Sequence, residues 1–164
     1  MRTSLVALLP FTVMAGLLGE LPLGFKRAEA ETAPPLAVVV AKNSPVNQLS
    51  LYELKHLYLG DHVNGPDGKR LIPLNRALGS PERVALDASV LGMSPDQETA
   101  YWIDRRIRGQ SGSPRAIPQA DLAQRIVGHL EGGITYVRFD EVRPDVKVLR
   151  IDSKLPTDPG YRVH

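Results

Sequence analysis

The stretch LAVVVAKNSPVNQLSLYELKHLYLG, residues 36–60, decides the fold that the sequence predicts. Its first six residues form a continuous apolar run rich in β-branched side chains, which is typical of a strand buried on both faces, as in a parallel sheet. Ser50 and Glu53 then form a capping-box pattern, which predicts a helix that ends near residue 59. Gly60 stands where many helices end in a left-handed residue. A buried strand followed by a capped helix indicates an α/β domain.

Short strands and helices with clear start signals also make up the rest of the chain. We predict a strand over 71–75, helices after Ser80 and Ser94, a loop over 109–118, a helix over 121–130, and strands over 134–137 and 146–151. Proline cannot donate to a neighbouring strand, so Pro73 favours an edge position or a strand end. In the helix over 121–130 we expect four apolar side chains to face inward: Leu122, Ile126, Val127 and Leu130. The element order predicts an α/β fold, a small mixed sheet flanked by about four helices.

The first thirty residues have the pattern of an export signal. A positive start is followed by an apolar run from Leu5 to Gly19, and Ala28-Glu29-Ala30 fits the small-x-small rule for cleavage. The run is shorter than the ~20 residues that a membrane span needs. We therefore predict a removable signal, residues 1–30, and a single domain, residues 31–164, in the periplasm or outside the cell. An uncleaved anchor is the alternative.

Composition argues against several classes of function. The chain has no cysteine, which excludes disulfides, thiolate metal sites and a cysteine nucleophile. Its net charge is +2, which gives no overall attraction to nucleic acid or to an anionic membrane. The histidines lack the spacing of metal ligands, and no pair of carboxylates stands out as acid and base. We therefore expect no metal, no cofactor, no nucleic acid partner and no enzymatic activity, while the oligomeric state stays open.

The segment from Arg76 to Arg83 is the candidate ligand site. Gly79 would let the backbone approach an anion, Ser80 has a hydroxyl to donate, and the two arginines would supply bidentate contacts to an oxyanion. The alternative is structural, with Ser80 as an ordinary N-cap and both arginines solvated. A second basic cluster is either an anion nest or a region that docks a partner; it comprises Arg105, Arg106, Arg108 and Arg115.

These motifs, taken in order, resemble the phosphate-binding proteins of ABC transporters in the type 2 periplasmic-binding-protein superfamily. The phrase that ends at Gly60, the Gly79-Ser80 pair with Arg83, Tyr101-Trp102 with its following loop, and GGITYV at 132–137 are similar to motifs of that family. The resemblance covers about residues 36–151. It implies a type 2 periplasmic-binding-protein-like fold.

The resemblance also has departures. The family motif reads Gly-Ser-Gly-Thr-Arg, whereas here Pro81 removes an N–H group and Glu82 places a negative charge beside the site. A full member has two lobes that close around the ligand, and only the middle and C-terminal part is recognised here. Two functions therefore stay open. The first is non-catalytic binding of phosphate or a related oxyanion through Arg76, Gly79, Ser80 and Arg83. The second is a ligand-free, single-lobe module that docks on an envelope, transporter or sensor protein.

Overall fold

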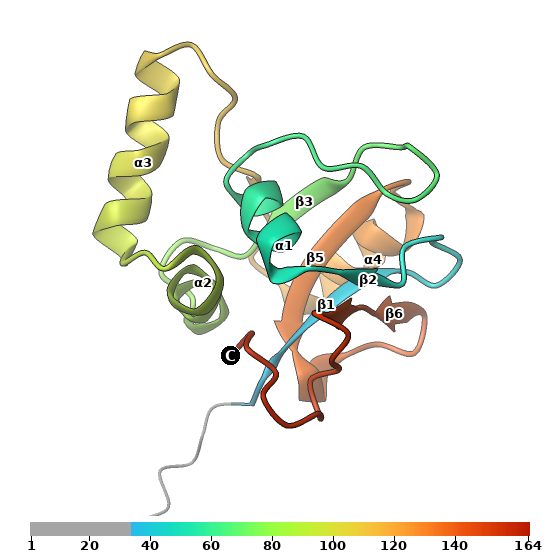
Figure 1. Cartoon of the computed structure of the whole chain (residues 1–164). Coiled ribbons are helices and arrows are strands. Elements are labelled where there is room, and N and C mark those ends of the chain that lie inside the picture. Colours follow the sequence, from blue (N-terminus) through green and yellow to red (C-terminus); the bar gives the residue numbers. More distant parts are fainter. Residues whose placement is uncertain (1–33) are drawn as a thin grey trace, which may run out of the picture. The chain divides into compact units, whose positions relative to one another are not determined.

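The computed structural model describes residues 34–164, and the expected export signal over residues 1–30 lies outside this range. A mixed sheet has the strand order β4-β3-β5-β1-β6 (Figure 1). Its strands are β1 (Leu36–Ala41), β3 (Ile72–Asn75), β4 (Arg115–Ala116), β5 (Gly133–Arg138) and β6 (Val146–Val148). A second, small sheet joins β2 (Gln48–Leu49) in parallel with β7 (Arg150–Ile151).

The helices complete the α/β fold that the sequence predicts. They are α1 (Leu51–Tyr58), α2 (Pro81–Leu86), the π-helical turn η1 (Asp87–Leu91), α3 (Pro95–Ile107), α4 (Ala120–His129) and the 3-10 turn η2 (Phe139–Glu141). A mixed sheet flanked by four α-helices confirms the predicted fold class. No helix within residues 34–164 combines the length and the apolar character needed to cross a membrane.

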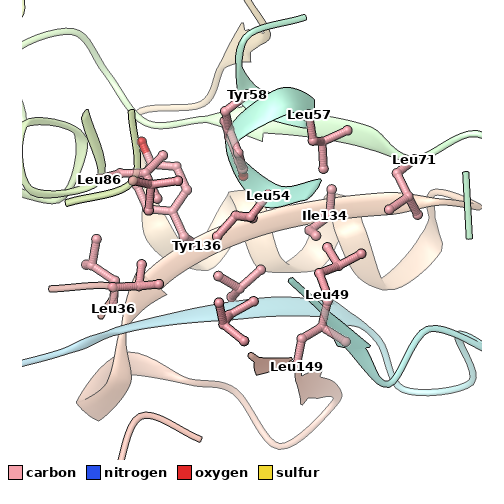
Figure 2. Packing of buried hydrophobic residues seen from close by; sticks show 14 of the residues in the cluster. Leu36, Leu49, Leu54, Leu57, Tyr58, Leu71, Leu86, Ile134, Tyr136 and Leu149 are labelled. Carbon is pink, nitrogen blue, oxygen red and sulfur yellow. The ribbon is translucent and has the colours of Figure 1, made fainter. Parts of the chain in front are cut away.

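Helices cover both faces of the sheet, so its central strands are buried on both sides. Because side chains alternate along a strand, Val38 and Val40 share one face with Tyr136, while Ala37 and Val39 face the other way. The first face packs against residues of α1, α2 and η1, as Figure 2 shows for Leu54, Leu57, Tyr58 and Leu86. On the other face, α4 packs through Ala123 and Val127.

Strand β1 is buried as predicted, but its direction differs from the prediction. It runs antiparallel to both neighbours, with Val38 opposite Tyr136 of β5 and Val40 opposite Lys147 of β6. The expectation of a parallel arrangement for this strand is therefore wrong. An unbroken apolar run reports burial on two faces, and helices on both faces of the sheet produce that burial for an antiparallel strand as well.

The helix start signals are confirmed in atomic detail. The backbone N–H of Ser50 donates to the Glu53 carboxylate over 2.8 Å, and the Glu53 N–H donates back to the Ser50 hydroxyl over 3.1 Å. Ser94 and Gln97 form a second capping box at the start of α3. Gly60 has a φ of +88°, the left-handed conformation expected after α1.

Three local expectations need correction. Leu122 is 44% exposed, because the buried positions of α4 are Ala123, Gln124 and Val127. The Gln124 amide tolerates burial since it donates to the Glu141 carbonyl and accepts from the Arg143 N–H. The loop over 109–118 contains β4, and the strand over 146–151 divides into β6 and β7.

Pro73 lies inside the sheet, as the second residue of β3. It pairs with Ile134 of β5, whereas β4 pairs only with the last two residues of β3. The missing N–H of proline therefore falls where β3 has a single bonded neighbour.

Candidate functional site

Arg76 follows directly after β3, and its side chain points into the protein. Its Nη1 donates to the Ile117 carbonyl over 3.1 Å, and its buried Nε has no hydrogen-bond partner among the described residues. Its backbone N–H lies 3.3 Å from the hydroxyl of Tyr136, which in turn donates to the Asn75 side chain. The interpretation of Arg76 as a solvated residue is therefore wrong. The side chain fixes the base of the turn that leads to α2.

Gly79 is exposed at the top of this turn, and Ser80 beside it is half-buried. Gly79 has a φ of +77°, and a Cβ built there would meet no atom within 4 Å, so the space beside it is open. The Ser80 hydroxyl accepts the N–H of Arg83 over 3.3 Å, which confirms that Ser80 is the N-cap of α2. The hydroxyl proton of Ser80 is not used by this bond. The turn thus offers one hydroxyl donor beside open space, at the start of a helix.

Arg83 is buried beneath the turn in a network of ionic contacts. Only 4% of the residue is exposed. Its Nε lies 3.0 Å from Asp87 Oδ2, its Nη2 donates to the Glu98 carboxylate, and its Nη1 donates to the Arg76 carbonyl over 3.3 Å. The interpretation of Arg83 as solvated is wrong as well. All three nitrogens of its guanidinium are engaged inside the protein.

The network holds one guanidinium between two carboxylates, and this imbalance affects the Asp87 carboxyl. The pKa of Asp87 is raised to about 6, chiefly by burial; Arg83 lowers it, and the nearby Glu98 carboxylate adds to the rise. Burial also raises the pKa of the Tyr136 hydroxyl. Near pH 6, Asp87 therefore takes up a proton, and the charge under the turn becomes more positive.

A cavity of about 240 Å³ opens beside the turn and connects the two basic clusters. It is lined by Arg83 of the first cluster and Arg106 of the second. The other lining residues are Leu78, Glu98, Thr99, Trp102, Ile103, Ser113, Pro114 and Ala116. Arg106 is exposed, and within residues 34–164 no carboxylate lies within 4.0 Å of it. It is therefore an accessible guanidinium on this cavity.

The other arginines of the second cluster serve different neighbours. The guanidinium of Arg105 lies over the rings of Tyr101 and Trp102, 5.7 and 5.9 Å from the two centroids, and 3.6 Å from Asp61. Arg108 pairs with Asp104 on the surface of α3. Arg115 lies on β4 and lines a second cavity, which contains neither Arg106 nor Arg108.

Sequence reasoning missed two contributors to this site. Trp102 is buried and also lines the cavity. Glu98 was not singled out, because 15 residues separate it from Arg83. The Arg83 and Asp87 pair did carry a sequence signal, since opposite charges four residues apart meet on a helix.

Comparisons with known proteins give a fold and no relative by sequence. No protein-family model matches the chain, and no curated protein matches it. Among solved structures, an ABC-type phosphate transport receptor from Vibrio cholerae superposes with a TM-score of 0.61 at 17% identity, over 76% of this chain and 48% of that one. A putative phosphate ABC transporter substrate-binding protein with bound phosphate from Clostridium perfringens gives 0.58 at 22% identity, over 73% and 46%.

A third structure, PstS from Borrelia burgdorferi, gives a TM-score of 0.58 at 12% identity, over 76% of this chain and 49% of that one. The chain therefore spans about half the length of the solved structures it matches. At these identities the likeness establishes the fold. The family resemblance seen in the sequence is confirmed at this level: the chain has the fold of about half of a phosphate-type substrate-binding protein.

Proposed function

We propose that this chain is an exported, non-catalytic binding protein of the phosphate ABC transporter type, which takes up phosphate or a related oxyanion at the turn over 76–83. The observation that carries the proposal is the turn at Gly79 and Ser80, with open space beside Gly79, in a fold shared with phosphate receptors. One of those receptors, from Clostridium perfringens, has phosphate bound. Under this proposal residues 1–30 are the removed signal, and residues 31–164 act in the periplasm or outside the cell.

The turn offers a neutral hydrogen-bond donor to an anion, and charged side chains lie buried beneath it. The Ser80 hydroxyl and the positive end of the helix dipole would face the ligand directly. Arg76 and Arg83 lie beneath and contribute charge from the interior, which Asp87 and Glu98 offset. Arg106 would supply the accessible guanidinium, because it lines the adjoining cavity. Binding should therefore strengthen as Asp87 becomes protonated near pH 6.

Calorimetric titration of the chain with phosphate, sulfate and acetate tests this proposal at pH 8 and pH 5.5. We expect saturable phosphate binding that is weaker in Arg106→Gln and Ser80→Ala. Sulfate keeps its charge over this pH range, so its binding should be tighter at the lower pH. Arg125→Gln is the matched control, since Arg125 lies on α4 and pairs with Asp121 on the surface. The absence of saturable heat with any of the three anions at both pH values would overturn the proposal.

A second candidate function, a ligand-free module that docks on a protein, is favoured by the surface of α3. Ile103 and Ile107 are 55% and 80% exposed, one helical turn apart, and Leu78 next to the same cavity is 66% exposed. Arg106 lies beside them. An apolar and basic surface of this kind fits an acidic partner with an apolar patch on an envelope, transporter or sensor protein.

A photo-crosslinking residue at position 107 tests the second candidate in extract from the source cell's envelope. We expect a discrete adduct that disappears when Arg106→Glu is added. A crosslinker at Tyr52 on α1, which is 71% exposed, controls for exposure alone. Equal labelling from both positions, or no adduct from position 107, would count against a docking role for α3.

A further inference from the structure

A cavity of about 440 Å³ lies between α1, β3, α4 and the loop that leads into β4. It has only Pro114 in common with the cavity beside the 76–83 turn, and none of the candidate oxyanion residues lines it. Its volume falls within the roughly 300–1,000 Å³ of small-molecule sites. It is therefore a separate site in the protein.

The floor of this cavity is apolar. It is formed by six side chains from three elements and the segment after β4: Leu57, Ile72, Leu74, Ile117, Ile126 and Leu130. Leu57 and Leu74 are buried, while Ile72 remains 40% exposed within the sheet. A ligand with an apolar body would cover Ile72 and remove that surface from water, which is favourable.

The rim of the cavity has a net positive charge. Its acidic residue, Asp61, is already engaged, 2.6 Å from His56 Nδ1 and 3.6 Å from Arg105 Nη1. Arg70 and Arg115 are exposed, and no carboxylate within residues 34–164 lies within 4.0 Å of either. Two guanidinium groups without an ionic partner thus stand above an apolar floor.

The loop at one side of the cavity is held by weak contacts. The Ser111 hydroxyl donates to the Gly60 carbonyl and accepts from Arg105 Nη2, both over a long 3.4 Å. Gly112 also lines the cavity, and a Cβ built there would meet no atom within 4 Å, so the space beside it is open.

We propose that this cavity binds a small organic carboxylate with an apolar body. The apolar body lies on the floor, and the carboxylate accepts hydrogen bonds from Arg70 and Arg115, the geometry that guanidinium groups favour for carboxylates. Inorganic phosphate would leave the apolar floor empty. The ligand class therefore differs from that of the 76–83 turn, and the two sites should bind independently.

Three probes separate the two parts of the ligand in calorimetric titrations. Octanoate, below its micellar range, has both the carboxylate and the apolar body, acetate lacks the body, and 1-octanol lacks the charge. We expect saturable binding of octanoate that is at least tenfold tighter than that of either other probe. A hydrogen bond to a charged group contributes about tenfold or more relative to 1-octanol, and burial of the alkyl chain favours octanoate over acetate. Saturating phosphate should not displace octanoate, because the two ligands are proposed to bind at different sites. Absence of octanoate binding would therefore leave the oxyanion proposal unaffected.

Variants then assign the binding to this cavity. The double variant Arg70→Gln/Arg115→Gln should weaken octanoate at least tenfold and leave 1-octanol unchanged, and both positions are exposed enough to preserve the fold. Ile72→Gln should weaken octanoate and 1-octanol together. Arg125→Gln/Arg150→Gln, on α4 and β7 and outside the cavity, is the control for loss of two exposed positive charges. No saturable octanoate binding, equal affinity for 1-octanol, or full affinity in the double variant would each overturn the proposal.

Discussion

The Arg83→Met variant tests whether Arg83 is a structural residue that stabilises the fold or a residue that is available to bind a ligand. The side chain contacts both Asp87 and Glu98, and all three residues are almost entirely buried. Met preserves the apolar stem but leaves two carboxylates without a positive partner. Removal of one partner from a buried ion pair costs about 3–5 kcal/mol. We expect a loss of this size in the free energy of unfolding at pH 8.

The loss should depend on pH, because the Asp87 carboxyl can take up a proton. The pKa of Asp87 is about 6 with Arg83 present, and removal of the guanidinium raises it. At pH 5 the Asp87 carboxyl of the variant is therefore neutral, and the loss should be smaller than at pH 8. Urea unfolding at both pH values, with a common slope, measures the difference.

A triple variant tests whether the loss of stability comes from the unpaired buried carboxylates. Arg83→Met/Asp87→Leu/Glu98→Met removes the whole charge network, and apolar replacements of buried ion pairs are often neutral or stabilising. We expect it to recover most of the stability that Arg83→Met loses. A loss below about 1 kcal/mol for Arg83→Met at both pH values would refute the reasoning, and would mean that the guanidinium is free to bind a ligand.

Three further outcomes follow from the structure. Ser50→Ala breaks the capping box of α1 and should lower the free energy of unfolding by about 1 kcal/mol in urea titrations. Gly132→Ala should cost more than 2 kcal/mol of unfolding free energy or prevent folding, because φ is +71° and a Cβ would lie 2.4 Å from the Arg70 carbonyl oxygen. Gly68→Ala is its control: φ is also positive there, but the surrounding space is open, and the cost should be about 1 kcal/mol. Asp87 has a pKa raised from 3.8 to about 6, so its stabilising contribution is present below pH 4 and is lost as pH rises through 6. Wild type should lose up to roughly 3 kcal/mol over this interval, and Asp87→Asn should remove that dependence in unfolding measured from pH 4 to 7.

Signals that lie within a few residues of one another were readable from the sequence. The capping residues Ser50 and Ser94, the left-handed Gly60 and the buried run of β1 each report a local physical requirement, and each is found in the structure. Ser80 belongs to the same class, since an N-cap is defined by its own next three residues. These signals were enough to predict the α/β class.

Features that depend on distant partners were not readable. From the sequence alone, Arg83 has the pattern of an exposed charge after an N-cap. In the structure it is buried, because Glu98 of α3 pairs with it in addition to Asp87. Leu122 has the apolar character of a core residue, yet α4 is rotated about its axis so that Gln124 faces the interior instead. Strand direction was missed for the same reason, because both neighbours of β1 come from the far end of the chain.

The position of β1 also governs when the protein can fold. It is the first strand of the described chain, it lies between β5 and β6, and its partners are about a hundred residues away in the sequence. Native pairing of this strand cannot begin until β5 and β6 are available, and such long-range pairing is intrinsically slow. A chain synthesised in N-to-C order would thus hold β1 unpaired until about a hundred more residues have been made. If the protein is exported as proposed, this delay keeps the chain unfolded for passage across a membrane, and it makes β1 the segment that a chaperone would most need to cover.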